Sequence, residues 1–353
     1  MLDEQVKKKL LDGTVIPAHP LALNEDRTLD EENQRRLTHY YMESGAGGIA
    51  VGVHTTQFEI RDPQFGLYER ILLLAVEEID KKKSKGTFIK IAGVCGHTDQ
   101  ALEEARTAKG LGYDMVLLNN GGLSGLSEAE LLDRTRKVAE LMPVFGFYLQ
   151  PSVGGRAFSY EFWKEFAEIP NIHAIKMAPF NRYQTLDAAR AVCHSSRCSE
   201  IALYTGNDDN IINDLLTAYE FNVNGQMVKK QIAGGLLGQW AVWTHQAVQM
   251  LEEIKAVRSS RQIPPSLLTL GQQLTDANAA LFDSANGFKG CIAGINEVLA
   301  RQGLLKGNWC LLDKEKLSPG QSDEIDRVCR DYPHLTDDAF AKRFLAESRS
   351  FSL

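Results

Sequence analysis

The chain has 353 residues, of which 44% are hydrophobic and 24% charged, the composition of an ordinary globular protein. Its net charge of −7 argues against nucleic acid or an anionic membrane as a general partner. The charged N-terminus has no apolar signal segment, no apolar run reaches membrane-spanning length, and the six cysteines lack CxxC spacing. We therefore expect a cytoplasmic protein without a secretory leader, a zinc ribbon or a disulfide framework.

Short apolar, β-rich segments alternate with amphipathic helical patterns along most of the chain. This alternation predicts parallel strands with right-handed crossovers, and eight strand segments favour a closed (β/α)8 TIM barrel over an open sheet. No Gly-x-Gly-x-x-Gly follows the first strand, so a dinucleotide-binding fold has little support. The predicted strands are Thr14–His19, Gly48–His54, Phe88–Gly96, Met115–Asn120, Val144–Gln150, His173–Ala178, Ile201–Asn207 and Ile232–Trp240. The predicted helices between them are Asp30–Ser44, Leu67–Lys82, Thr98–Leu111, Glu128–Met142, Ser159–Ala167, Gln184–Cys193 and Asp209–Phe221.

Only helical patterns follow the Pro264-Pro265 pair. We expect residues 1–258 to form the barrel, with the active site at the carboxyl ends of its strands, and residues 259–353 to form a helical extension packed on it. The predicted helices of this extension are Ser266–Phe282, Asn286–Gln302, Gly320–Cys329 and Thr336–Glu347.

Polar side chains at the ends of the predicted strands should converge on one pocket for a small polar molecule. Lys176 gives the clearest indication, because it lies within the apolar run His-Ala-Ile-Lys-Met-Ala. Burial lowers the pKa of an amine, and a neutral amine attacks carbonyls to form a Schiff base. The alternative is a lysine that pairs with a carboxylate or extends to solvent. The other strand ends offer His19, His54 with Thr55 and Thr56, His97, Asn119 with Asn120, Tyr148 with Gln150, Asn207 with Asp208, and Gln239 with Trp240.

Tyr148 ends the strand before that of Lys176, where its phenol is expected to shuttle protons; the alternative is an ordinary core tyrosine. Gly52 and the hydroxyls of Thr55 and Thr56 are candidates to hold a carboxylate, although a hydrogen-bonded turn explains them equally well. His54 is a rival candidate in the same segment, as an acid–base group or a metal ligand. The metal role is the weaker of the two, because no second histidine stands at ligand spacing.

Arg156, in the loop that begins at Tyr148, is the best placed guanidinium for a carboxylate, with a surface role as its alternative. Gly238, in Gly-Leu-Leu-Gly, allows close approach of a ligand or tight strand packing. Trp240 and Phe58 would suit an aromatic substrate. Asp208 with Asp209 indicates a turn and helix cap rather than a cation site.

Five motifs occur in a fixed order along the chain: Tyr148-Leu149-Gln150-Pro151, Ile175-Lys176, Thr205-Gly206-Asn207-Asp208, Gly235-Leu236-Leu237-Gly238 and Asn286-Gly287-Phe288-Lys289-Gly290. This ordered set resembles the dihydrodipicolinate synthase / N-acetylneuraminate lyase family of class I aldolases. The resemblance implies that Lys176 forms an imine with pyruvate or a related 2-oxo acid. It also implies that Tyr148 shuttles protons and anchors the carboxylate, that Gly206 lies in the substrate site, and that the chain forms a dimer or tetramer.

Two departures from the family pattern narrow the expected function. Gly52-Val53-His54-Thr55-Thr56 replaces the family's Gly-Thr-Thr-Gly-Glu loop, and Asn119-Asn120 offers no counterpart to the synthases' strand-four tyrosine. We therefore expect a divergent Schiff-base aldolase or dehydratase acting on a small 2-oxo or sugar-derived acid, without a metal or organic cofactor. The alternatives are a hydratase-aldolase acting on an aromatic 2-oxo acid, an inactive ligand-binding barrel and, more remotely, a metal-dependent hydrolase.

Overall fold

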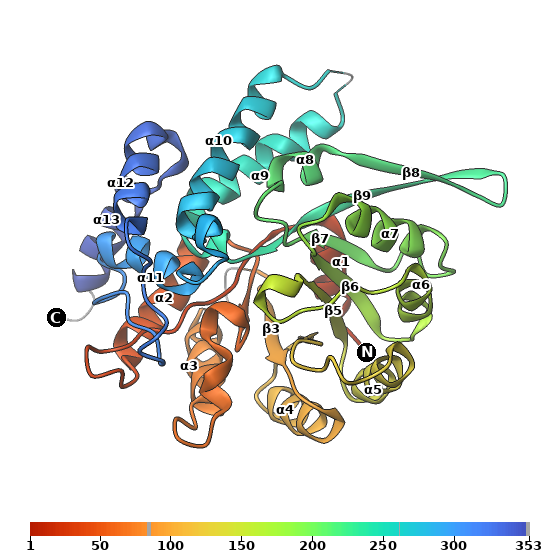
Figure 1. Ribbon diagram of the computed structural model, residues 1–353, viewed down its shortest axis with the longest axis horizontal. Helices are drawn as coiled ribbons and strands as arrows, with labels where there is room; N and C mark the ends of the chain where they lie inside the picture. Colours follow the sequence, from red (N-terminus) through yellow and green to blue (C-terminus); the bar gives the residue numbers. More distant parts are fainter. Residues whose placement is uncertain (83–85, 261, 351–353) are drawn as a thin grey trace. The chain divides into compact units, whose positions relative to one another are not determined.

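Strands and helices alternate along the chain in the computed structural model, which describes residues 1–82, 86–260 and 262–350 (Figure 1). The strands are β1 Val15–Pro17, β2 Gly48–Val51, β3 Ile89–Val94, β4 Met115–Leu118, β5 Val144–Leu149, β6 Ile172–Ala178, β7 Ala202–Thr205, β8 Ala218–Val223 and β9 Gln226–Leu237. The helices are α1 Glu4–Asp12, α2 Glu31–Glu43, α3 Tyr68–Lys81, α4 Thr98–Gly110, α5 Glu128–Leu141, α6 Tyr160–Glu168, α7 Arg182–Cys193, α8 Ile211–Leu216, α9 Thr244–Arg258, α10 Pro265–Leu281, α11 Cys291–Arg301, α12 Gln321–Asp331 and α13 Asp338–Ser350. None of these helices is long and apolar enough to cross a membrane.

Contacts within the chain divide it into two compact units, Met1–Thr14 with Ile89–Leu236 and Val15–Phe88 with Leu237–Leu353. The domain boundary expected between residues 258 and 259 stays a prediction, although α9 ends at Arg258. Residues 261 and 351–353 of the expected extension lie outside the described part of the chain.

The first unit contains parallel strands in the order β9-β7-β6-β5-β4-β3, with α4 to α7 arranged around them (Figure 1). β4, β5, β6 and β7 are buried along their whole length, as expected of parallel strands that are covered on both faces. β5 and β6 are in register from Phe145↔Ala174 to Leu149↔Ala178, but Val144 pairs with Ile172, so His173 is left out as a β-bulge. This bulge decides which side chain of β5 lies beside Lys176.

A β-hairpin replaces the end of one predicted helix. The helix expected over Asp209–Phe221 ends at Leu216, and the chain continues into β8, which pairs antiparallel with β9 (Figure 1). Asn224 and Gly225 form the turn with φ values of 52° and 86°, as a two-residue type I′ turn requires. The helix prediction was therefore wrong beyond Leu216, and the Asn-Gly pair between alternating apolar residues is the feature that identifies the hairpin. α1 and α9 also form where no helix was predicted.

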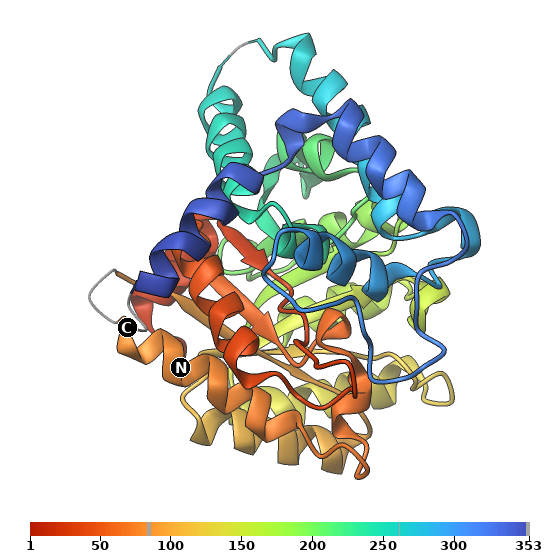
Figure 2. The same ribbon diagram turned by 90° about the vertical axis from the view of Figure 1, so that its left-hand side faces the viewer.

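The second unit holds β1 and β2, joined by a parallel bridge between Ala18 and Ala50. α13 packs on α2 within this unit (Figure 2). The Tyr40 and Phe344 rings meet edge to face there, with their centres 5.7 Å apart. The Tyr40 hydroxyl donates to Asp337 Oδ2 at 2.6 Å, and the His245 backbone N–H donates to the same oxygen at 3.0 Å. This buried carboxylate therefore ties the start of α13 to both α2 and α9.

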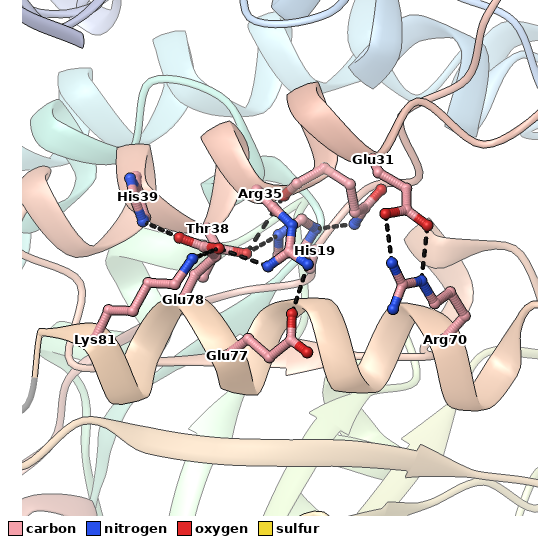
Figure 3. Close-up of polar contacts among 10 residues, drawn as sticks. His19, Glu31, Arg35, Thr38, His39, Arg70, Glu77, Glu78 and Lys81 are labelled. Carbon is pink, nitrogen blue, oxygen red and sulfur yellow. Dashed lines mark hydrogen bonds and ion pairs between the residues drawn. The ribbon is translucent and has the colours of Figure 1, made fainter. Parts of the chain in front are cut away.

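Charged side chains also connect α2 with α3 (Figure 3). Glu78 of α3 is only 3% exposed, and its Oε1 lies 2.6 Å from both Arg35 Nη1 of α2 and Lys81 Nζ. His39 Nε2 approaches its other oxygen at 2.5 Å. The buried carboxylate is thus compensated by charges from both helices, as a buried charge requires.

Candidate active site

Lys176 lies in the middle of β6, a strand whose seven residues are all buried. Its register partners are Phe147 of β5 and Tyr204 of β7, so these three side chains lie on the same face of the sheet. Lys176 is 7% exposed, and its Nζ lies 4.4 Å from the centre of the Phe147 ring. The expectation of a buried lysine within an apolar strand is confirmed.

Gly206 leaves the space through which the Lys176 side chain passes. A Cβ atom at Gly206 would lie 2.6 Å from Lys176 Cε and 2.8 Å from the Ala178 Cβ, closer than packed atoms can approach. Glycine is therefore required next to the lysine. Gly206 thus lies in the lysine's immediate surroundings, whereas its contact with a substrate stays a prediction.

Asp214 of α8 holds the chain in this position at the end of β7. Its buried carboxylate accepts hydrogen bonds from Thr205 Oγ1 at 2.7 Å and Asn207 Nδ2 at 2.9 Å, and it forms an ion pair with Arg182. Asn207 Oδ1 in turn accepts from the backbone N–H of Phe180, just beyond β6, at 3.0 Å. This network joins the ends of β6 and β7. Asp214 could not be identified from the sequence, because its partners come together only in the fold.

A buried arginine organises the ends of β3 and β4. Arg134 of α5 is fully buried, and it donates from Nε to Gly96 O at 2.8 Å, from Nη1 to Asn120 Oδ1 at 3.1 Å and from Nη2 to Asn119 O at 3.1 Å. Burial lowers its pKa to about 10. Asn119 and Asn120, which were expected to lie at a strand end, are therefore partly occupied with holding the loop together.

Tyr148 does not lie beside Lys176, contrary to the geometry expected from the sequence. Because β5 pairs Phe147 with Lys176, Tyr148 points to the opposite face of the strand. Its ring packs against Trp163 of α6 at 4.9 Å and against Phe158 at 5.7 Å. Its hydroxyl accepts from the Phe158 backbone N–H at 3.2 Å, and burial raises its pKa. In this arrangement Tyr148 is part of an aromatic cluster between β5 and α6.

Arg156 makes its contacts in the loops after β4 and β5. Its Nη1 donates to Leu126 O at 2.7 Å, and its guanidinium carbon lies 5.4 Å from the centre of the Phe158 ring. A contact between Arg156 and a substrate carboxylate stays a prediction.

The remaining predicted site residues lie in the second unit. Thr56 Oγ1 donates to His19 O at 2.7 Å and accepts from the Gly52 and Val53 backbone N–H groups, so its proton is already used in the bond to the His19 carbonyl. Thr55 is buried as well, and within the described residues its hydroxyl has no hydrogen-bond partner. Of the two threonines, Thr55 is therefore the better candidate for a ligand contact. Its Oγ1 lies 3.5 Å from where a Cβ of Gly238 would be.

His54 and Trp240 differ in their exposure. His54 is half-buried, with its ring tilted against Phe58 at 5.7 Å. Trp240 is completely buried in the 3-10 turn Gln239–Ala241, which interrupts the expected eighth strand after Leu237. A fully buried indole offers no surface to an aromatic substrate. Trp240 therefore does not support the expectation of an aromatic ligand. The helix cap expected at Asp208-Asp209 is also wrong, because Asn210 is the N-cap of α8.

The comparison with known proteins assigns the family. A model of the dihydrodipicolinate synthetase family matches residues 12–228, more than half of the chain. The chain belongs to this family.

The curated relatives of this family member are named as two different enzymes, a synthase and a lyase. A 4-hydroxy-tetrahydrodipicolinate synthase of Caldicellulosiruptor bescii is 27% identical over 192 residues, 53% of this chain and 60% of the relative. An N-acetylneuraminate lyase of Escherichia coli is 25% identical over 197 residues, 55% of this chain and 62% of the relative. The chain thus spans about 60% of the length of the curated relatives that it matches.

Solved structures of the family extend the similarity of fold over most of the chain. Dihydrodipicolinate synthase of Oceanobacillus iheyensis superimposes with a TM-score of 0.71 at 16% identity, covering 90% of this chain and 95% of the other. N-acetylneuraminate lyase of Fusobacterium nucleatum, complexed with pyruvate, gives 0.69 at 17% identity, covering 92% and 99%. These structures confirm the predicted (β/α)8 barrel with C-terminal helices.

His19 is a core residue in this family member rather than a group available to a ligand. It is fully buried; its Nδ1 lies 2.8 Å from Pro20 O, and its Nε2 lies 3.0 Å from Thr38 Oγ1 (Figure 3). A neutral ring that donates from Nδ1 and accepts at Nε2 satisfies both contacts. Burial lowers the pKa of His19 to about 4, against a weaker opposing effect of the Pro20 carbonyl.

We expect this histidine to make the fold acid-sensitive. The unfolded chain binds a proton at His19 below about pH 6.5, whereas the folded chain binds it only below about pH 4. The free energy of unfolding should therefore fall as the pH drops through this window, by about 3 kcal/mol in total from this residue. In His19→Asn, the unfolding free energy from urea titrations should depend less steeply on pH between 6.5 and 4.5, by about 1 kcal/mol per pH unit. His334→Gln, which removes an exposed histidine, is the control, and equal slopes for the two variants would contradict the assignment.

Proposed function

We propose that this protein is a Schiff-base-forming lyase that acts on pyruvate or another small 2-oxo or sugar-derived acid through Lys176. The observation that carries the proposal is the buried Lys176 amine beside the Phe147 ring, in space that Gly206 leaves open. Burial favours the neutral, nucleophilic form of an amine. The relatives named as synthases and lyases, and the pyruvate in the Fusobacterium nucleatum structure, support the same substrate class.

The proposed chemistry begins with attack of the Lys176 amine on the C2 carbonyl of the acid. The carbinolamine loses its oxygen as water, which leaves a protonated imine between Nζ and C2. The imine withdraws electrons from C3, so that a C3–H or C3–C4 bond can break and leave an enamine. Protonation of the enamine at C3 and hydrolysis of the imine release the product and restore the amine. This sequence needs no metal or organic cofactor.

Borohydride trapping tests the proposal directly. The protein is incubated with pyruvate and sodium borohydride, digested, and mapped by mass spectrometry, and we expect one reduced adduct at Lys176. Absence of an adduct with pyruvate and with a panel of 2-oxo acids would overturn the imine chemistry. An adduct at another lysine would overturn the site. The expected homo-oligomer stays a prediction, which sedimentation of the purified chain measures.

The second candidate function is a barrel that binds a 2-oxo acid without converting it. The position of Tyr148 on the far face of β5 favours it, because the phenol expected to move protons does not adjoin the amine. Exchange of the pyruvate methyl protons in deuterated water separates the two candidates, since exchange requires turnover between imine and enamine. A trapped adduct with exchange supports the lyase, whereas a trapped adduct without exchange supports the binding protein.

Tyr148→Phe should leave the chemistry at Lys176 nearly unchanged. The substitution removes one hydroxyl that accepts from the Phe158 backbone, so we expect a loss of about 1 to 2 kcal/mol in unfolding free energy. The methyl-exchange rate should change by less than about threefold, whereas loss of a general acid or base costs about a hundredfold or more. A hundredfold loss with normal stability would show that Tyr148 reaches the substrate in another arrangement. Tyr160→Phe, on the half-buried first residue of α6, is a matched control.

A further inference from the structure

Two cysteines flank the turn between α7 and β7 in the first unit. α7 ends at Cys193, which is buried, and Cys198 follows in the turn, half-buried. Both thiols are free, and they lie close enough for each to shift the pKa of the other. Neither cysteine belongs to the site around Lys176, because the turn precedes β7 and Gly206 follows it.

The turn that carries Cys198 is firmly attached to its surroundings. Arg197 Nη2 donates to Ile172 O at 2.7 Å, and the Ser196 backbone N–H donates to Glu168 Oε1 at 2.8 Å. The Cys198 backbone N–H donates to Ser195 O at 3.3 Å, which closes the turn. These bonds fix the turn that joins Cys198 to Cys193 at the end of α7.

A lysine from the hairpin adds positive charge to the pair. Lys230 of β9 is half-buried, and its Nζ donates to the Cys198 carbonyl. The neighbouring Cys193 thiol lowers the pKa of Cys198, and the Lys230 charge lowers it further, against the effect of burial. The neighbouring Cys198, together with burial, raises the pKa of Cys193. The pair therefore presents one thiolate next to one thiol, the combination that thiol–disulfide chemistry uses.

We propose that Cys193 and Cys198 form a dithiol site that peroxides oxidise to a reversible disulfide. The Cys198 thiolate attacks one oxygen of hydrogen peroxide, the O–O bond breaks, and the hydroxide released takes up a proton to become water. The Cys193 thiol then attacks the sulfenic sulfur, which forms the S–S bond and expels the oxygen with the Cys193 proton as a second water. Two thiols are oxidised by two electrons and one peroxide is reduced.

The short spacing of the two cysteines makes reversibility the expected property. A disulfide that closes a loop of a few residues constrains the unfolded chain little, so it gains little of the stability that protects structural disulfides. Two of the other cysteines contrast with this pair. Burial raises the pKa of Cys329, and it raises that of Cys310 to about 12. Both should react with peroxide far more slowly than Cys198.

Peptide mapping of the intact protein tests the proposal. Trypsin cleaves after Arg197, between the two cysteines, so a disulfide joins peptide 191–197 to peptide 198–229. After treatment of the reduced, folded protein with hydrogen peroxide, we expect this linked pair and an intact mass lower by two hydrogens, both reversed by dithiothreitol. Cys198 should be consumed on the order of ten times faster than Cys329. Linked peptides that appear only in urea, or oxidation of Cys329 first, would overturn the proposal.

Single variants identify the reacting sulfur. In Cys193→Ser the sulfenic acid at Cys198 should persist and be captured by dimedone, whereas in Cys198→Ser no dimedone adduct should form at Cys193. Lys230→Met should slow the oxidation, because it removes the positive charge near the thiolate. Cys329→Ser is the matched control and should leave the linked peptides unchanged. If a serine variant does not fold, the alkylation rates of Cys198 and Cys329 are compared in the natural chain. Cys198 should react faster, and equal rates would overturn the proposal.

Discussion

Lys176→Met should abolish both the borohydride-trapped pyruvate adduct and the exchange of pyruvate methyl protons. The change removes the nucleophile but keeps an apolar side chain of similar length beside Phe147 and Gly206, so the surroundings of the site should persist. We expect the exchange rate to fall by roughly a thousandfold or more, to the rate in buffer. The rate is measured by proton NMR in deuterated water, and the adduct by mass spectrometry.

Two further variants separate the loss of the nucleophile from the loss of a buried charge. Lys176→Arg keeps a cation, but a guanidinium does not lose its proton and forms no imine, so this variant should be as inactive as Lys176→Met. Lys230→Met removes a half-buried lysine of the same unit and should keep both adduct and exchange. Exchange at more than a tenth of the natural rate in Lys176→Arg would rule out Lys176 as the nucleophile.

The position of Lys176 could be predicted from the sequence, but the position of Tyr148 could not. Counting from the pair Val144↔Ile172 with unbroken register would place Tyr148 opposite Lys176, because each lies four residues further along its strand. The bulge at His173 shifts the register by one residue, and a shift of one residue moves a side chain to the other face. A fully buried strand shows no alternation of apolar and polar residues, so its sequence does not indicate where a bulge lies. The motif around Tyr148 therefore identified the strand but not the face.

The hairpin and the buried polar groups show two other limits. Asn224-Gly225 is a turn signal, but it follows the end of the helix predicted over Asp209–Phe221, and no hairpin was predicted there. Arg134 and Asp214 lie in helices that were predicted, yet nothing in their own segments marks them. Their partners, such as Gly96 and Asn207, come from other elements, so their function follows only from the fold.

Arg134 combines a high desolvation cost with several hydrogen bonds, which makes it a sensitive point of the first unit. No carboxylate pairs with its guanidinium among the hydrogen bonds and ion pairs of the described residues; the three acceptors are two backbone carbonyls and one amide oxygen. Burial lowers the pKa of Arg134 to about 10, because desolvation disfavours its charged form. The three hydrogen bonds must compensate for this desolvation cost. The three acceptors belong to the segments that end β3 and β4, so the same bonds fix the carboxyl ends of both strands.

Arg134→Met should therefore lower the free energy of unfolding by about 3 kcal/mol or more, because it leaves two buried acceptors and one partly buried acceptor without a donor. Arg134→Lys should recover only part of the loss, since an ammonium cannot replace the planar arrangement that reaches all three oxygens. The measurement is urea unfolding followed by circular dichroism. Arg136→Met, two residues along the same helix, is the control: its side chain is 48% exposed and lies 3.7 Å from Glu165, so we expect a change within about 0.5 kcal/mol. If both arginine-to-methionine variants lost the same stability, the loss would come from the helix rather than from the strand ends. If only Arg134→Met lost stability while the pyruvate adduct still formed at the natural rate, Arg134 would stabilise the fold without positioning the site.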